Sequence, residues 1–334
     1  MINTKFAIHA LKATRILCTQ QYSTENLEKV GFFDYLISSM EPGQNGLTKD
    51  SELWPHIFSI FLSLPPQSPI TAKFICISFP YIVFFLNEKL ESEKESYASI
   101  KSKTDPNILE KDTNLIQTQE SIMNLISHVS NNVSKLAIEN PSTLQALTEL
   151  IYIQLESSFK IIHRIYKKSD INFKNLLNIE SHTIPTSSIL IIHSCLLSLN
   201  NMAGHPFMTL PRGFQKEGSD QSIMNLLILA IEDLGNILQK IKDKDKTEPD
   251  RRLRFSKVIF QSIEMAAQLF YGLCKSNPSS NLNKDERRKT DSRYRKFNAA
   301  VDFTVTSIQE NKESDFYFDI DFLNNTTQKV KLLR

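Results

Sequence analysis

Glycine is scarce in this chain, and that scarcity restricts its fold more than any other feature. Only 8 of the 334 residues are glycine. Parallel α/β folds use glycine in nucleotide loops, and all-β folds use it in tight turns. Leucine, isoleucine and phenylalanine recur over long stretches with the spacing of an amphipathic helix. The sequence therefore predicts an all-α protein, either an irregular α-solenoid of the armadillo or HEAT type or a bundle of antiparallel helices.

Start and stop signals place the expected helices along the chain. Asn140 followed by Pro141 is a cap with proline at the first helical position. We expect helices over residues 25–40, 51–64, 122–136, 141–168, 186–202, 220–242, 249–275 and 293–309. The most apolar run, 74–86, is too short to span a bilayer and contains Pro80. It predicts a buried helix bent at that proline.

Composition changes divide the chain. Residues 91–119 are rich in Ser, Lys, Glu, Asp and Thr and poor in apolar residues, which is typical of a solvated linker. We therefore expect an N-terminal helical segment over 25–90, the polar linker, a main helical domain over 120–310 and an extended tail over 311–334.

The first 24 residues have the character of a mitochondrial presequence. They contain Lys5, Lys12 and Arg15 but no acidic residue. On a helix, one face would carry the apolar residues Ile2, Phe6, Ala10, Ala13 and Leu17. This pattern predicts a mitochondrial presequence over 1–24 and a matrix location. The alternatives are an ordinary first helix of the fold and a cytoplasmic or nuclear protein.

No catalytic or cofactor motif occurs. The four cysteines lie far apart, which argues against a structural zinc site and a secreted disulfide framework. His193 and Cys195 are close in sequence but would point to different sides of a helix. The acidic pair Glu232 and Asp233 has no obvious histidine partner. We therefore predict no catalytic residue, no metal site and no cofactor.

Two basic clusters are the candidate RNA-binding site. The net charge is only +2, so any attraction to RNA must be local. The first cluster falls within two helical turns, and the second interleaves aromatic residues that could stack on bases. The candidates are Arg251, Arg252, Arg254, Lys257, Arg287, Arg288, Arg293, Tyr294, Arg295, Lys296 and Phe297. The alternative for both clusters is a solvated, charged surface. For the second cluster, this surface would be a loop that leads into a helix.

The C-terminal segment shows a different pattern. Phe316, Phe318, Ile320 and Phe322 alternate with polar residues or tyrosine. Strict alternation favours an extended strand with one apolar face. Such a strand would dock onto a partner or fold back onto its own core.

Together these features predict a helical binding protein without catalytic activity. The first hypothesis is a mitochondrial protein that associates with RNA or a ribonucleoprotein through residues 251–297. The second is a scaffold or assembly subunit that binds other protein subunits and makes no direct RNA contact. No membrane span is expected in either case.

Overall fold

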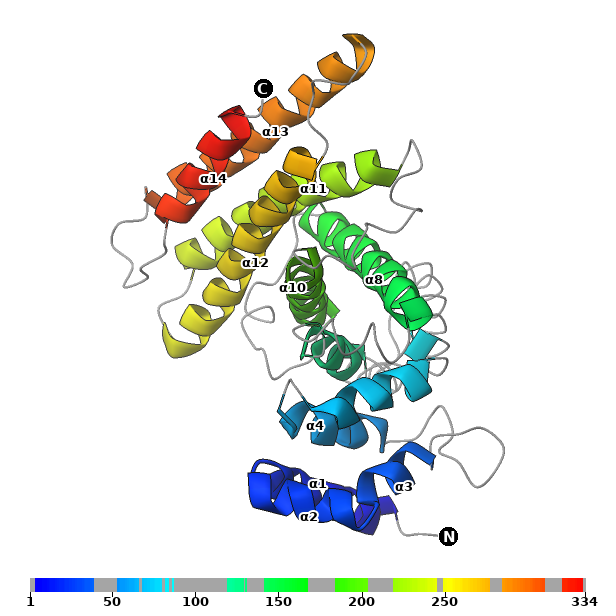
Figure 1. Ribbon diagram of the computed structural model, residues 1–334. Coiled ribbons are helices and arrows are strands. Elements are labelled where there is room, and N and C mark those ends of the chain that lie inside the picture. Colours follow the sequence, from blue (N-terminus) through cyan, green and yellow to red (C-terminus); the bar gives the residue numbers. More distant parts are fainter. Residues whose placement is uncertain are drawn as a thin grey trace, which may run out of the picture. The chain divides into compact units, whose positions relative to one another are not determined.

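The computed structural model describes residues 4–38, 53–65, 68–79, 82–83, 86, 119–128, 130, 141–167, 184–203, 219–244, 249–276, 284–309 and 320–332. All regular structure in these ranges is helical, which confirms the all-α prediction (Figure 1). The chain forms two compact units, Met1–Ile151 and Tyr152–Arg334. The predicted linker lies outside the described residues except for Gln119.

The first unit begins with short helices. They are α1 (Thr4–Cys18), α2 (Gln21–Lys29), α3 (Phe32–Ser38) and α4 (Trp54–Ser63), followed by helical residues at 69–79 and 119–128. The single helix expected over 25–40 is wrong. Gly31 has a φ of +71°, a left-handed conformation that glycine adopts without strain, and it separates α2 from α3.

Aromatic side chains form the core of the first unit. The helix expected over 51–64 is confirmed as α4, and its Ile57, Phe58 and Phe61 side chains are all buried. The ring of Phe61 stacks on Phe74 with 3.6 Å between centroids, and Phe58 meets the same Phe74 ring edge-on. Nε2 of His128 lies 2.8 Å from the carbonyl oxygen of Leu64, beyond the end of α4.

Helix α1 packs against α4 with a different face from the one that the sequence suggested. Ala7, Ile8, Leu11 and Thr14 are half-buried and Cys18 is buried, whereas the predicted apolar face is exposed at Phe6, Ala10, Ala13 and Leu17. The helix therefore has two apolar sides, and the tertiary fold covers the one that ends in Cys18.

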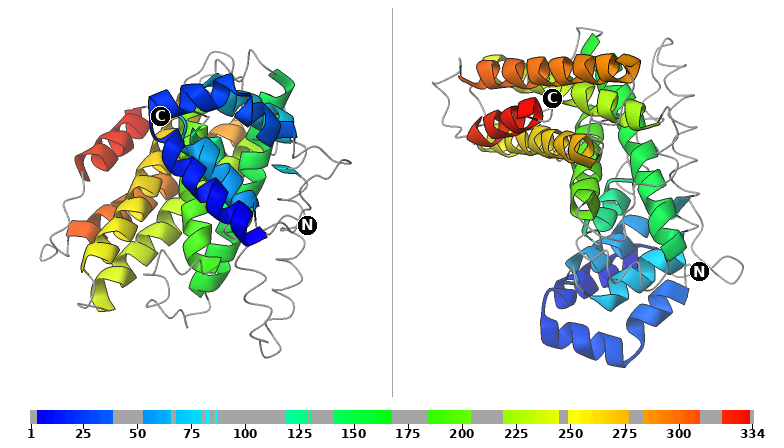
Figure 2. Two further views of the ribbon diagram at one scale, coloured as in Figure 1. Left: turned by 90° about the horizontal axis from the view of Figure 1, so that it is seen from below. Right: turned by 45° about the horizontal axis from the view of Figure 1, so that its top comes forward.

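The second unit is built from long helices. The boundary between the units falls within α8 (Pro141–Lys167). The other helices of the second unit are α10 (Ile184–Ala203), α11 (Ser219–Lys244), α12 (Pro249–Ser276), α13 (Lys284–Gln309) and α14 (Ile320–Leu332). Helix α12 packs against α10, α11 and α14, while α11 also packs against α13 (Figure 1 and Figure 2).

Most predicted helices of the second unit are confirmed, with one difference in length. Helix α8 begins at Pro141 as its start signal predicted. Helix α13 begins at Lys284, whereas the sequence placed the start near Arg293 and treated the preceding residues as a possible loop. Lysine, arginine and glutamate are good helix formers and need no apolar stripe when the first turns of a helix are solvated.

None of the described helices is both long enough and apolar enough to cross a bilayer.

Candidate functional site

The first basic cluster lies at the start of α12. Arg254 and Lys257 are exposed on the outer side of this helix. Arg251 and Arg252 lie in its first turn, and their side chains fall outside the described part of the structure. Helix α12 thus presents at least two cations to solvent at its N-terminal end.

The second basic cluster lies on α13. Arg288, Arg295 and Lys296 are exposed and Arg293 is half-buried. Arg287 also lies in α13, with a side chain outside the described residues. Arg288 and Arg295 are seven positions apart and therefore share one face of the helix.

The aromatic residues of this cluster are core residues. Tyr294 is 1 % exposed and Phe297 is fully buried. The Phe297 ring stacks on Phe270 of α12 at 4.2 Å between centroids, and Tyr294 meets Phe270 edge-on at 6.3 Å. The predicted stacking of RNA bases on these two rings is therefore wrong, because the rings join α13 to α12. The period of the helix separates the inward aromatics from the outward cations.

The extended strand expected at the C-terminus is also wrong where the structure describes it. Ile320 and Phe322 lie in the first turn of α14, and Phe316 and Phe318 lie outside the described residues. The buried residues of α14 are Leu323, Thr326, Thr327 and Val330. Their spacing is helical, but two of these buried residues are threonines, so the sequence shows only a weak helical period of apolar residues.

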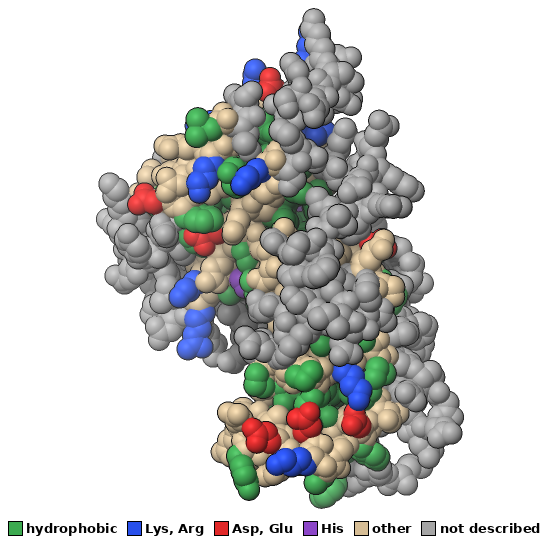
Figure 3. All heavy atoms as spheres, viewed as in Figure 1, with side chains coloured by type: hydrophobic (Ala, Val, Ile, Leu, Met, Phe, Trp, Pro, Cys, Tyr) green, Lys and Arg blue, Asp and Glu red, His purple; other side chains and the backbone are tan. Residues whose placement is uncertain are grey.

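Phe322 nevertheless borders a surface groove between α10, α12 and α14. This C-terminal groove has a volume of about 410 Å³ and is lined by His193, Leu197, Gln261, Glu264, Met265, Gln268 and Phe322. Apolar side chains from all three helices lie beside the amides of α12. Figure 3 shows apolar and basic side chains close together on the face that α12 and α14 form.

His193 supplies a hydrogen-bond acceptor to this groove. Its Nδ1 lies 3.2 Å from the hydroxyl oxygen of Ser262, which itself donates to the carbonyl of Val258. Nδ1 must then carry the hydrogen, and the lone pair of Nε2 remains for another donor. Burial lowers the pKa of His193 from its ordinary value, partly offset by a hydrogen bond to Val258. Burial therefore disfavours the charged form of the ring.

A second groove lies between α11 and α13. This α11–α13 groove has a volume of about 650 Å³. Its apolar lining is Ile228, Leu229, Ala299, Ala300 and Phe303, and its polar lining is Asn225, Glu232, Asn236 and Lys296. Lys296 was predicted to contact RNA, and the fold places it on one wall of this groove.

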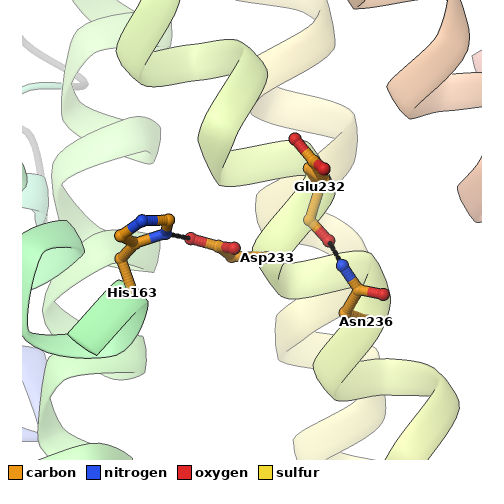
Figure 4. Close-up of polar contacts among 4 residues, drawn as sticks. All are labelled: His163, Glu232, Asp233 and Asn236. Carbon is orange, nitrogen blue, oxygen red and sulfur yellow. Dashed lines mark hydrogen bonds and ion pairs between the residues drawn. The ribbon is translucent and has the colours of Figure 1, made fainter. Parts of the chain in front are cut away.

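A histidine and a carboxylate meet between α8 and α11. Nδ1 of His163 donates to a carboxylate oxygen of Asp233 over 2.8 Å, with the histidine one third exposed and the aspartate nearly buried. Figure 4 shows these side chains pointing toward each other, beside the Asn236 amide that donates to the Glu232 carbonyl. The prediction that Asp233 has no histidine partner is wrong. The pair compensates a buried carboxylate and joins two helices.

One signal in the sequence pointed to this pair. Asp233 lies three positions after Ala230 and four positions before Ile237, and the side chains of Ala230 and Ile237 are both buried. An acid on the apolar face of a helix needs a partner from another helix. The sequence does not say which histidine supplies it.

The cysteines are free thiols. Burial raises the pKa of Cys18 to about 11 and that of Cys274 to about 12, and it also raises the pKa of the fully buried Cys195. Among the described residues, no three His, Cys, Asp or Glu side chains are grouped so that they could hold a metal ion.

Comparison of the chain with protein-family models, with curated proteins and with solved structures finds no match.

Proposed function

We propose that this chain is a non-catalytic helical scaffold that binds a segment of a partner protein in the C-terminal groove. The observation that carries this proposal is the composition of the groove. Leu197, Met265 and Phe322 offer an apolar floor, and they come from three different helices. Apolar floors bordered by a few placed polar groups are typical of peptide-binding grooves.

The polar border of the groove defines the chemistry of the partner segment. Nε2 of His193 and the carboxylate of Glu264 accept hydrogen bonds, and the two glutamines both donate and accept. A segment with an apolar side chain between lysine, arginine or amide side chains would complement this border. A strongly acidic segment would be repelled by Glu264.

Association with RNA is the competing proposal and has weaker support. Arg254 and Lys257 on α12, and Arg288 and Arg295 on α13, are exposed cations that could contact phosphates. Tyr294 and Phe297 do not add base stacking, since both are buried. The mitochondrial location likewise stays a prediction that rests on the basic residues of the first 24 positions.

A density-gradient profile of the tagged full chain from lysate, with and without ribonuclease, separates the two proposals. Phe322→Ser places a polar group in the groove, and Asn325→Ser changes an exposed residue one turn later on the same helix. We expect a heavy peak that survives ribonuclease, disappears with Phe322→Ser and persists with Asn325→Ser.

A peak that collapses with ribonuclease, or in a variant with Arg288 and Arg295 changed to glutamine, would instead support RNA association. A peak that Phe322→Ser leaves unchanged would overturn the groove as the docking site. The helical content of each variant, measured by circular dichroism, shows whether the fold is intact.

A further inference from the structure

The α11–α13 groove carries opposite charges on its two walls. Glu232 stands on the α11 wall and Lys296 on the α13 wall, and both side chains are exposed. Neither forms an ion pair with another residue in the described ranges. An exposed pair of unmatched, opposite charges beside an apolar floor is ready to contact a complementary surface.

The floor between these charges exposes large apolar side chains. Leu229 on α11 is 42 % exposed and Phe303 on α13 is 40 % exposed. Ala299 and Ala300 line the same groove with small side chains, which leave room for a larger side chain. Exposed apolar residues from two helices that converge on one hollow are typical of an interface rather than of scattered surface residues.

The arrangement is complementary to itself. Helices α11 and α13 run side by side in the same direction (Figure 1 and Figure 2). A two-fold axis along the groove would place α11 of each copy over α13 of the other. Glu232 would then face Lys296 of the second copy, and the reverse contact would form at the same time.

We propose that the α11–α13 groove binds a second copy of this chain and forms a two-fold symmetric dimer. In this dimer Leu229 enters the hollow above the alanines of the other copy. Two ion pairs between Glu232 and Lys296 set the register of the helices. The surface is separate from the C-terminal groove, so the dimer does not depend on the proposed partner.

Charge reversal tests the proposal on the full chain by analytical ultracentrifugation. The wild type is expected to sediment as a dimer of the 38.3 kDa chain. Glu232→Lys and Lys296→Glu each bring two like-charge contacts into the interface, and each should weaken dimerisation by at least about tenfold. The matched controls Asp302→Lys on α13 and Lys275→Glu on α12 reverse exposed charges outside the groove and should leave the dimer intact.

Two further samples separate a symmetric dimer from a general effect of charge. An equimolar mixture of Glu232→Lys and Lys296→Glu should form heterodimers, because one ion pair then forms with its native sign and the other with reversed sign. The double variant Glu232→Lys/Lys296→Glu should form homodimers again. Leu229→Ser should weaken the wild-type dimer without any change of charge.

A monomeric wild type would overturn the proposal. A mixture that remains as monomeric as its two components would overturn it as well. If the wild type is monomeric and Leu229→Ser removes a protein from the density-gradient peak, the groove belongs to a different partner.

Discussion

At the residue scale, Gly235 shows how one missing side chain sets the distance between two helices. A Cβ atom built on Gly235 would collide with the hydroxyl oxygen of Thr304, which donates to the carbonyl of Ala300 on α13. Thr304 is fully buried, so its hydroxyl has no solvent to move into. Glycine therefore allows α11 and α13 to approach closely at this point.

We expect Gly235→Ala to lower the free energy of unfolding by about 1–3 kcal/mol, since a methyl group would be forced into a packed core. The matched control is Gly272→Ala on α12, where an added Cβ meets nothing within 4 Å. This variant should raise stability by about 0.5–1 kcal/mol through helix propensity. Urea denaturation measures both changes.

Removing the hydroxyl should relieve the collision. The double variant Gly235→Ala/Thr304→Ala is expected to lower the free energy of unfolding by less than the sum of the losses in the two single variants. Strict additivity would mean that Gly235 is not in contact with Thr304.

At the element scale, α13 and α14 show why helical faces were harder to predict than helices. The cations of α13 were recognised, but the inward direction of Tyr294 and Phe297 depends on where α12 lies. The helical period of α14 was hidden because Thr326 and Thr327 occupy buried positions. Both threonine hydroxyls donate to carbonyls one turn earlier, so they can be buried.

The contact between α10 and α12 should depend on pH through His193. Its pKa is lowered in the folded protein by burial, so the unfolded chain binds the proton more tightly. As pH falls through the ordinary value of 6.5, the unfolded state becomes protonated first and stability decreases. Stability is retained above that pH, where both states are neutral.

His193→Gln keeps a polar side chain but cannot titrate in this range. We expect the variant to lose less stability than the wild type when pH is lowered from above to below 6.5, as measured by thermal unfolding monitored by circular dichroism. Glu264 lines the same groove and stays unchanged in both proteins. An equal loss in wild type and variant would assign the pH dependence to other groups.

At the scale of the whole molecule, the reactivity of the cysteine thiols can follow the unfolding of each of the two units separately. Cys18 is buried in the first unit, and Cys195 and Cys274 are buried in the second. Their raised pKa values keep them as thiols, which react slowly. Cys76 is half-buried in the first unit.

Maleimide labelling of the native chain should modify Cys76 first and the other three cysteines only after unfolding. With increasing denaturant, Cys195 and Cys274 should become reactive together, since they share one compact unit. Mass spectrometry of proteolytic fragments identifies the order. Rapid native labelling of Cys195 would contradict its burial.

The sequence by itself determined most of the long helices of the second unit, because helix formation follows from propensity, caps and a period that is local to each segment. Helices α10, α11 and α12 were predicted close to their observed ends, and α8 starts at its predicted proline. The tertiary structure alone decided which faces of α1, α13 and α14 are covered. It turned Tyr294 and Phe297 inward, paired Asp233 with His163 and brought Glu232 and Lys296 to opposite walls of one groove. These contacts join residues far apart in the chain, and their geometry depends on how whole helices pack.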